Sequence, residues 1–146
     1  MAADEYPSDV TSAVEDRELL RGAAVTAGII ASGYFRKEVK TWTKENASPV
    51  TEADMVLDSF LHAALTAARP DYGWLSEESA PDDSRLACRR VFIVDPIDGT
   101  RGFIQGDDSW TVTMAVVENG IPVAGVVYAP ARDEMYDAAL GHGARL

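Results

Sequence analysis

Cysteine, histidine and basic residues are scarce in this 146-residue sequence. Its one cysteine, Cys88, excludes an intramolecular disulfide and a metal site built from cysteines. A single thiol is compatible with a reducing cytosol, so a cytoplasmic location is expected. Only 13 Lys and Arg residues stand against 24 Asp and Glu residues, which gives a formal net charge of −11. This balance leaves no basic stripe for a nucleic-acid polymer and no polybasic segment for anionic lipid.

Long apolar runs are also lacking. The most apolar long stretch, residues 22–35, is too short and too mixed to span a bilayer, so no membrane segment is expected. Residues 1–11 are polar and acidic, without the basic start and apolar core of a secretory signal, and they are expected to form a flexible tail. With 47% apolar residues, the remaining chain is long enough to bury a core, and residues 12–146 are predicted to belong to one domain.

Two helices followed by several strands are predicted. A capping-box pattern at residues 12–15 and helical spacing of apolar residues predict a helix over residues 12–37. After a polar loop or short ribbon, Thr51 is expected to cap a second helix that ends near residue 69. Strands are predicted at residues 74–75, 91–94, 110–117, 122–128 and 134–138. This order indicates an α+β fold in which two long helices cover one face of a mainly antiparallel sheet.

Polar chemistry is concentrated in Asp95-Pro96-Ile97-Asp98-Gly99-Thr100, directly after a buried strand. Pro96 is expected to end that strand and to hold a bend that brings Asp95 and Asp98 together. Such proximity is unfavourable for like charges unless a cation lies between them. Oxygen ligands without nearby His or Cys favour Mg²⁺, with Mn²⁺ and Ca²⁺ as alternatives. Gly99 lets a ligand approach the backbone and Thr100 brings a hydroxyl that can orient water, so the pattern predicts a metal paired with a phosphate.

Four other residues could belong to the same site. Glu77 and Glu78 follow the short strand at residues 74–75, and because adjacent strand residues point to opposite sides, only one of them is expected to face a given site. Asp54 lies in the first turn of the second helix, where favourable interaction with the helix dipole is by itself a sufficient role. Lys44 is the cation of interest in the preceding loop. A Glu pair in isolation is more often solvated surface than part of a site.

These segments, in this order, resemble the inositol monophosphatase family of metal-dependent, lithium-sensitive phosphomonoesterases. The resemblance is carried by Pro49-Val50-Thr51-Glu52-Ala53-Asp54, by Trp74-Leu75-Ser76-Glu77-Glu78-Ser79 and by the segment from Asp95 to Thr100. The stretch from residue 110 to residue 143 also resembles the strands that follow in the family. The fold implied is the amino-terminal half of a layered α/β sandwich of the inositol monophosphatase and fructose-1,6-bisphosphatase type.

The resemblance also implies metal ligands. Glu77, Asp95 and the carbonyl of Ile97 would hold one Mg²⁺, and Asp95 and Asp98 would contribute to a second, in a set of two or three ions. Family members continue for about as many residues again, and that part carries a tryptophan-aspartate motif whose aspartate completes the second metal site. The chain is therefore expected to be the amino-terminal half of such an enzyme.

The remaining roles follow from the same resemblance. Gly99 and Thr100 would bind the phosphate through backbone N–H groups, and Thr100 and Asp54 would orient the attacking water. Glu78 would support the metal site, and Lys44 matches a lysine near it. The expected reaction is direct attack of metal-activated water on the phosphorus of a small phosphorylated metabolite.

Substrate and assembly stay open on the sequence. Residues 75–78 and 125–130 look most like the bacterial 3'(2'),5'-bisphosphate nucleotidase branch, which acts on adenosine 3',5'-bisphosphate; inositol monophosphatase and histidinol phosphatase are the alternatives. A hypothesis of another class is a catalytically deficient metal-binding remnant, or a half-enzyme that needs a separately encoded second half. A homodimer is a further alternative, since an unfinished apolar sheet can associate.

Overall fold

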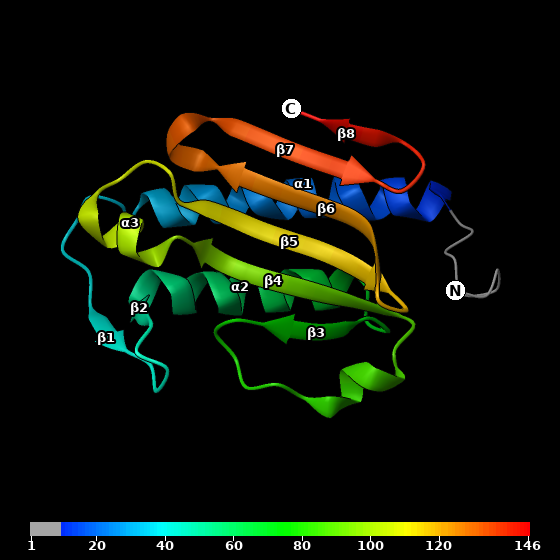
Figure 1. Ribbon diagram of the computed structural model, residues 1–146, viewed down its shortest axis with the longest axis horizontal. Helices are drawn as coiled ribbons and strands as arrows, with labels where there is room; N and C mark the ends of the chain where they lie inside the picture. Colours follow the sequence, from blue (N-terminus) through cyan, green and yellow to red (C-terminus); the bar gives the residue numbers. More distant parts are fainter. Residues whose placement is uncertain (1–9) are drawn as a thin grey trace.

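The computed structural model describes residues 10–146, and its centre is a six-stranded sheet (Figure 1). The strands follow one another in chain order and comprise β3 (Gly73–Ser76), β4 (Arg90–Asp98), β5 (Thr111–Glu118), β6 (Ile121–Ala129), β7 (Glu134–Ala139) and β8 (Gly143–Arg145). All neighbouring pairs are antiparallel except β3 and β4, which are parallel. The predicted ribbon is present as β1 (Thr41–Thr43) paired with β2 (Pro49–Thr51). The expected α+β fold with a mainly antiparallel sheet is confirmed.

Two long helices, α1 (Val10–Ser32) and α2 (Glu52–Ala68), lie side by side on one face of the sheet (Figure 1). Helix α1 contacts the β5, β6 and β7 side, and α2 contacts β3 and β4. A short helix α3 (Thr100–Gln105) follows β4, and the single 3₁₀ turns η2 (Asp83–Ala87) and η3 (Pro130–Arg132) connect strands. None of the helices among residues 10–146 is both long and apolar enough to cross a membrane.

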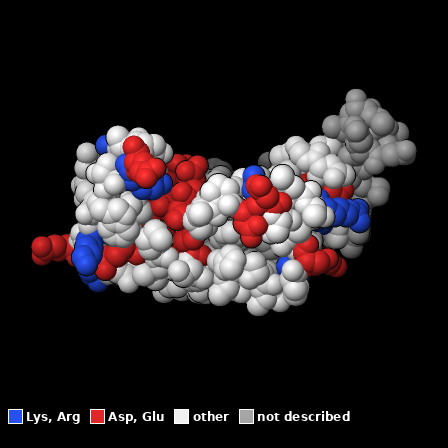
Figure 2. Space-filling model, turned by 90° about the horizontal axis from the view of Figure 1, so that it is seen from below, with Lys and Arg blue, Asp and Glu red and all other residues white. Residues whose placement is uncertain are grey.

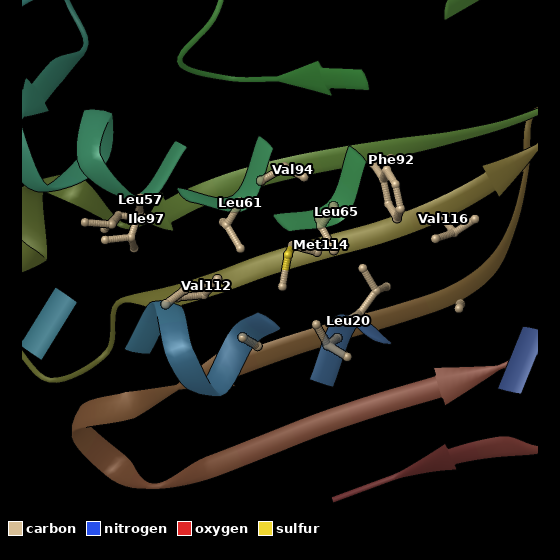
Figure 3. Packing of buried hydrophobic residues seen from close by; sticks show 14 of the residues in the cluster. Leu20, Leu57, Leu61, Leu65, Phe92, Val94, Ile97, Val112, Met114 and Val116 are labelled. Carbon is tan, nitrogen blue, oxygen red and sulfur yellow. The ribbon is translucent and has the colours of Figure 1, made fainter. Parts of the chain in front are cut away.

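The core forms where the apolar faces of the helices meet the sheet (Figure 3). Most of the residues expected on these faces are fully buried, namely Leu20, Ala24, Ala27 and Ala31 of α1 and Leu57, Leu61 and Leu65 of α2. Four others expected there are not: Tyr34, Phe60 and Ala64 are partly exposed, and Ala68 is exposed. The buried residues pack on the inward side chains of the central strands, which include Phe92, Val94, Val112, Met114 and Val116. Each fully buried leucine contributes about 2 kcal/mol of hydrophobic stabilisation. Gly28 lets α1 approach β6 closely, since a Cβ there would lie 2.6 Å from the ring of Tyr128.

The boundaries of the first helix differ from those predicted. Helix α1 begins at Val10, so Ser12 lies inside the helix instead of capping it, and residues 10 and 11 belong to α1 instead of to a tail. Residues 1–9 of that expected tail lie outside the described residues. The helix ends at Ser32, five residues before the predicted end. A tight hydrogen bond from Gly33 N to Ile30 O and a positive φ of 57° at Arg36 turn the chain away there.

Strand β4 also differs from the prediction, because it continues through Pro96 to Asp98. Its pairing with β5 runs from Asp95 opposite Thr113 directly to Asp98 opposite Thr111. Two residues of β4, Pro96 and Ile97, therefore lie opposite a single residue of β5, which is a β-bulge. A bulge tolerates proline because the ladder hydrogen bond that proline lacks is absent there. The strand expected to end at Pro96 therefore continues through it, and the irregularity there is this bulge.

The opposite face of the sheet carries no helix within residues 10–146 (Figure 1). It contains a shallow hollow of about 620 Å³, lined by Thr113, Ala115, Gly125, Val127, Tyr136 and Ala138 among others. Ile93, Val127 and Tyr136 are about two fifths exposed. Strand β8, which the sequence pattern did not predict, pairs with β7 at the edge of this face.

Candidate functional site

Three elements meet at one edge of the molecule. The first turn of α2 lies there, and so do the carboxyl ends of the parallel strands β3 and β4. A cavity of about 270 Å³ opens between the β1–β2 ribbon and the segment after β3. Its lining residues are Lys44, Ser48, Pro49, Glu77, Glu78, Asp95, Ile97, Gly99, Thr100 and Arg101. Figure 2 shows acidic side chains gathered in a hollow at this end of the molecule.

Asp54 is the most deeply buried acid of this region, with no exposed surface. One of its oxygens accepts hydrogen bonds from the backbone N–H of Thr51 at 2.9 Å and from the Thr51 hydroxyl at 2.6 Å. The other oxygen accepts a hydrogen bond at 2.9 Å from the hydroxyl of Thr100. Asp54 thus completes the capping box of α2 and also fixes Thr100, so dipole stabilisation is only part of its role.

Glu77 and Glu78 lie just beyond the end of β3, and both line the cavity. The expectation that only one of them could face the site is wrong, because the alternation of side chains applies within a strand and β3 ends at Ser76. The Glu77 N–H extends the pairing with β4 by donating to Val94 O at 3.1 Å. Lys44 lies 3.4 Å from the carboxylate of Glu78, whose side chain is only 4% exposed.

The electrostatics of Asp95 show how crowded the acidic groups are. Burial is the main cause that raises the pKa of Asp95 to about 7, and the charges of Asp98, Glu77, Glu78 and Asp54 raise it further. These five residues are called the carboxylate cluster below. Burial and the charge of Asp54 also raise the pKa of Glu78, although Lys44 opposes the shift.

The Ile97–Thr100 segment places backbone atoms at the same cavity. The Ile97 side chain is buried in the core, while its carbonyl oxygen lies 3.1 Å from the hydroxyl oxygen of Thr100. Gly99 adopts a left-handed conformation with φ of 86°, which favours glycine, and precedes the first turn of α3. Asp98 is exposed and does not line the cavity, so it acts on Asp95 through charge.

An aromatic cluster supports this segment from behind. The ring of Phe103 in α3 lies 5.0 Å from that of Trp110 and 5.5 Å from that of Phe35, measured between centroids. Phe103 and Trp110 are buried, so they anchor α3 between the end of α1 and the start of β5. The turn at Gly99 and Thr100 therefore rests on a rigid apolar base.

The chemistry of the donors fits a hard divalent cation. The cluster offers carboxylate oxygens, and a carbonyl and a hydroxyl lie beside it, which are ligands of Mg²⁺. Within residues 10–146, however, no three Asp, Glu, His or Cys side chains converge into a ready-made cation site.

Two buried polar residues at this edge were missed in the sequence. Asp58 is 7% exposed and Ser76 is 8% exposed, and the Ser76 hydroxyl donates a hydrogen bond to the Asp58 carboxylate. The available signal was spacing, since Asp58 lies four residues after Asp54 and shares its helix face. The pattern of leucines on that face predicted a purely apolar contact instead.

Fold and site together define an α+β protein with an acidic cavity, suited to cations held by oxygen ligands, at the carboxyl ends of two parallel strands. The chain belongs to the inositol monophosphatase family, whose model matches residues 14–146. It is 40% identical over 106 residues to the 3'(2'),5'-bisphosphate nucleotidase CysQ of Escherichia coli K12, covering 72% of this chain and 43% of that protein. It is 42% identical over 102 residues to the histidinol-phosphatase of Mycobacterium tuberculosis, covering 70% of this chain and 38% of that protein.

The chain also matches solved structures of this family. The extragenic suppressor protein suhB from Bartonella henselae matches with a TM-score of 0.82 at 33% identity, covering 88% of this chain and 50% of that one. CysQ from Bacteroides thetaiotaomicron, described as a bacterial member of the inositol monophosphatase family, matches with a TM-score of 0.74 at 33% identity, covering 89% and 48%. The chain thus spans at most about half the length of these relatives.

Proposed function

We propose that this chain carries most of the active centre of a Mg²⁺-dependent phosphomonoesterase that acts on a small phosphorylated metabolite. The observation that supports the proposal best is the 2.9 Å hydrogen bond from the Thr100 hydroxyl to Asp54, beside a cavity lined by acidic residues. This hydrogen bond brings together a hydroxyl and a fully buried carboxylate that are 46 residues apart in the sequence. Such a pair can hold and orient one water molecule.

In this proposal Glu77, Asp95 and the Ile97 carbonyl hold one Mg²⁺, and Asp95 and Asp98 contribute to a second. The bound ions supply a water of lowered pKa and neutralise charge that develops on the phosphate oxygens. Their positive charge is needed because the cavity is acidic and the chain carries a net charge of −11. Two or three ions are expected in the complete centre.

The other residues act on water and substrate. Asp54 accepts the Thr100 proton in the hydrogen bond, which leaves the Thr100 oxygen free to accept a hydrogen bond from the attacking water. Backbone N–H groups of Gly99 and Thr100, before the first hydrogen bond of α3 from Phe103 N to Gly99 O, bind the phosphate. Glu78 and its partner Lys44 hold the opposite wall of the cavity.

For the substrate we propose adenosine 3',5'-bisphosphate, with inositol phosphates and histidinol phosphate as alternatives. The support is the 40% identity to a bisphosphate nucleotidase, and the alternative rests on the 42% identity to a histidinol-phosphatase. Because the chain spans less than half of either protein, groups that select the leaving alcohol can lie outside the matched part.

The test is a phosphate-release assay of the purified chain with Mg²⁺ on the three substrates. Turnover that is fastest on the bisphosphate, requires Mg²⁺ and is inhibited by Li⁺ supports the proposal. Asp54→Asn is the matched loss-of-function variant, and Asp71→Asn, which removes an exposed acid, is the control. Equal turnover by Asp54→Asn and the unchanged chain would contradict the role of the Asp54–Thr100 pair.

A second candidate function is binding of a divalent cation by the carboxylate cluster without catalysis. It predicts Mg²⁺ binding without turnover. Measuring Mg²⁺ affinity by isothermal titration calorimetry beside the assay separates the two, since turnover by this chain alone would contradict the second candidate.

A further inference from the structure

Asp58 is an unusual residue for the position that it occupies. It lies on α2, one turn after Asp54, with 7% exposure, and among the interactions of the described residues no Lys or Arg forms an ion pair with it. Burying a charge without a cation is unfavourable, and here the carboxylate also lies close enough to the carboxylate cluster to act on Glu78 through its charge. A neutral residue would serve a purely structural role at lower cost. The hydrogen bond that Asp58 makes therefore indicates what its charge is for.

The hydrogen bond of Asp58 is connected, through Ser76, to the cavity residue Glu78. The Ser76 hydroxyl donates to Asp58 and accepts a hydrogen bond from the backbone N–H of Glu78 at 3.2 Å. A serine hydroxyl has only one proton, so donation to Asp58 leaves its lone pairs facing the Glu78 N–H. A carboxylate accepts and never donates when ionised, so it fixes this direction, whereas a neutral amide could present a donor and reverse it.

The segment after β3 is consequently held at three points. Glu77 N–H is bonded to Val94 O, Glu78 N–H is bonded to Ser76 Oγ, and Lys44 Nζ lies 3.5 Å from the carbonyl of Glu77. Two of these contacts come from neighbouring backbone and from Lys44, whose side chain is partly exposed. The buried Asp58–Ser76 pair is the contact that ties the segment to α2, the helix that also positions Asp54.

We propose that Asp58 and Ser76 are positioning residues that act as one unit: they hold the Glu77–Glu78 segment at the spacing from Asp54 and Asp95 that a divalent cation requires. The inference rests on the proposed function for the identity of the cation, but the Asp58–Ser76–Glu78 hydrogen bonds exist without it. Groups that orient metal ligands from behind commonly change metal affinity by about 10- to 100-fold when they are removed.

The experiment uses the full chain and the variants Asp58→Ala, Ser76→Ala and the double variant. Mg²⁺ affinity by titration calorimetry is expected to fall about tenfold in each single variant, and no further in the double variant, because both changes break the same chain of hydrogen bonds. Ser76→Thr keeps the hydroxyl and is expected to bind Mg²⁺ within about twofold of the unchanged chain. Ser59→Ala, an exposed position on the same helix, and Asp71→Asn control for helix changes and for loss of one negative charge.

A second measurement makes the result independent of the metal. Exchange of the Glu78 amide hydrogen with solvent, followed by NMR in a chelator, is expected to accelerate about tenfold in both single variants, with the Phe92 and Val94 amides of β4 unchanged. Unchanged affinity together with unchanged Glu78 exchange would overturn the proposal, and so would losses that add in the double variant. If the unchanged chain binds no Mg²⁺, the proposed function fails, and Glu78 exchange alone then decides whether Asp58 and Ser76 position the segment.

Discussion

Helix α2 and strand β4 each run between two clusters of charged residues, and the two clusters are built in opposite ways. At one end Arg90 forms ion pairs with Asp16 at 2.9 Å and with Glu118 at 3.1 Å, and Arg69 also pairs with Asp16; these four residues and Tyr72 are called the arginine network. At the other end the carboxylate cluster has only Lys44 as an ion-pair partner among the described residues. The 17 residues of α2 place these two ends about 25 Å apart.

The pKa values express this difference. Burial works to lower the pKa of Arg90, but its interactions with Tyr72, Glu118 and Asp16 outweigh burial and raise it, so the charged form is favoured. Burial and like charges raise the pKa of Asp95 to about 7, so there the charged form is disfavoured. The arginine network is complete within the chain, whereas the carboxylate cluster is suited to a positive charge from outside. The acids at one end are thus paired with cations of the same chain, and most of those at the other end are not.

The largest effect is expected from a substitution that breaks the arginine network. Arg90→Met leaves Asp16 and Glu118 buried without their main partner, and is expected to lower the free energy of unfolding by about 3 to 5 kcal/mol in urea titrations. Arg89→Met is the control, because Arg89 pairs with Glu118 from an exposed position and should cost under about 1 kcal/mol. Equal losses in the two variants would show that burial does not distinguish this network.

The second prediction concerns the opposite end. Asp95→Asn removes the acid whose pKa is raised by the charges of the other four residues of the carboxylate cluster. The Mg²⁺ affinity measured by calorimetry is expected to fall about 100-fold or more. The fold should be retained, because the substitution relieves repulsion in the absence of metal. Asp71→Asn serves as the charge-matched control, and unchanged affinity in Asp95→Asn would remove the basis for the site.

A smaller effect is expected from pH. Because the pKa of Asp95 is near its ordinary value in the unfolded chain and about 7 in the folded chain, the folded state holds this proton more tightly. Its contribution to stability is fully present below about pH 4, decreases as the pH rises and is lost above about pH 7. In a chelator, unfolding free energy should therefore be lower at pH 8 than at pH 5, by about 2 kcal/mol after allowance for solvent screening.

The change that tests this pH effect is Asp95→Asn, which should flatten the pH profile of urea unfolding relative to the unchanged chain. Saturating Mg²⁺ should do the same above pH 7, since a cation bound to the folded state restores stability. A profile with the same slope in all three samples would show that Asp95 does not carry the dependence.

The smallest effect is expected at an exposed ion pair, which serves as a reference for the arginine network and the carboxylate cluster. Arg132 and Asp108 form an exposed ion pair at 3.0 Å, with both side chains nearly half exposed. Arg132→Ala is expected to leave the free energy of unfolding unchanged within the error of urea titrations, and to leave Mg²⁺ affinity unchanged. A larger loss would mean that an ion pair stabilises this protein irrespective of burial, which would weaken the contrast with Arg90.

Periodicity and motifs predicted much of this structure. The spacing of Leu57, Leu61 and Leu65 identified the buried face of α2, and Asn119–Gly120 identified the hairpin between β5 and β6. These features depend on neighbours within a few residues. The segment from Asp95 to Thr100 was recognised for the same reason, because its polar groups are adjacent in the chain.

Contacts between distant segments could not be predicted in this way. Lys44 and Glu78 are 34 residues apart, Asp58 and Ser76 are 18 apart, and Asp16 and Arg90 are 74 apart. No periodicity links such positions, and their pairing follows from how α1 and α2 pack on the sheet. The bulge at Pro96 belongs to the same group, since its presence depends on the register with β5.

The order of the sheet has a consequence for how the molecule assembles. Every strand from β3 to β8 pairs with the strand next to it in the chain, and β4 to β8 do so as successive antiparallel neighbours. Closing short loops costs little entropy, so a sheet of this kind can form by adding one hairpin after another. Helices α1 and α2 precede all six strands of this sheet and are available to cover each pair as it forms. The chain is therefore suited to rapid folding during its own synthesis, with each new strand extending a sheet that already exists.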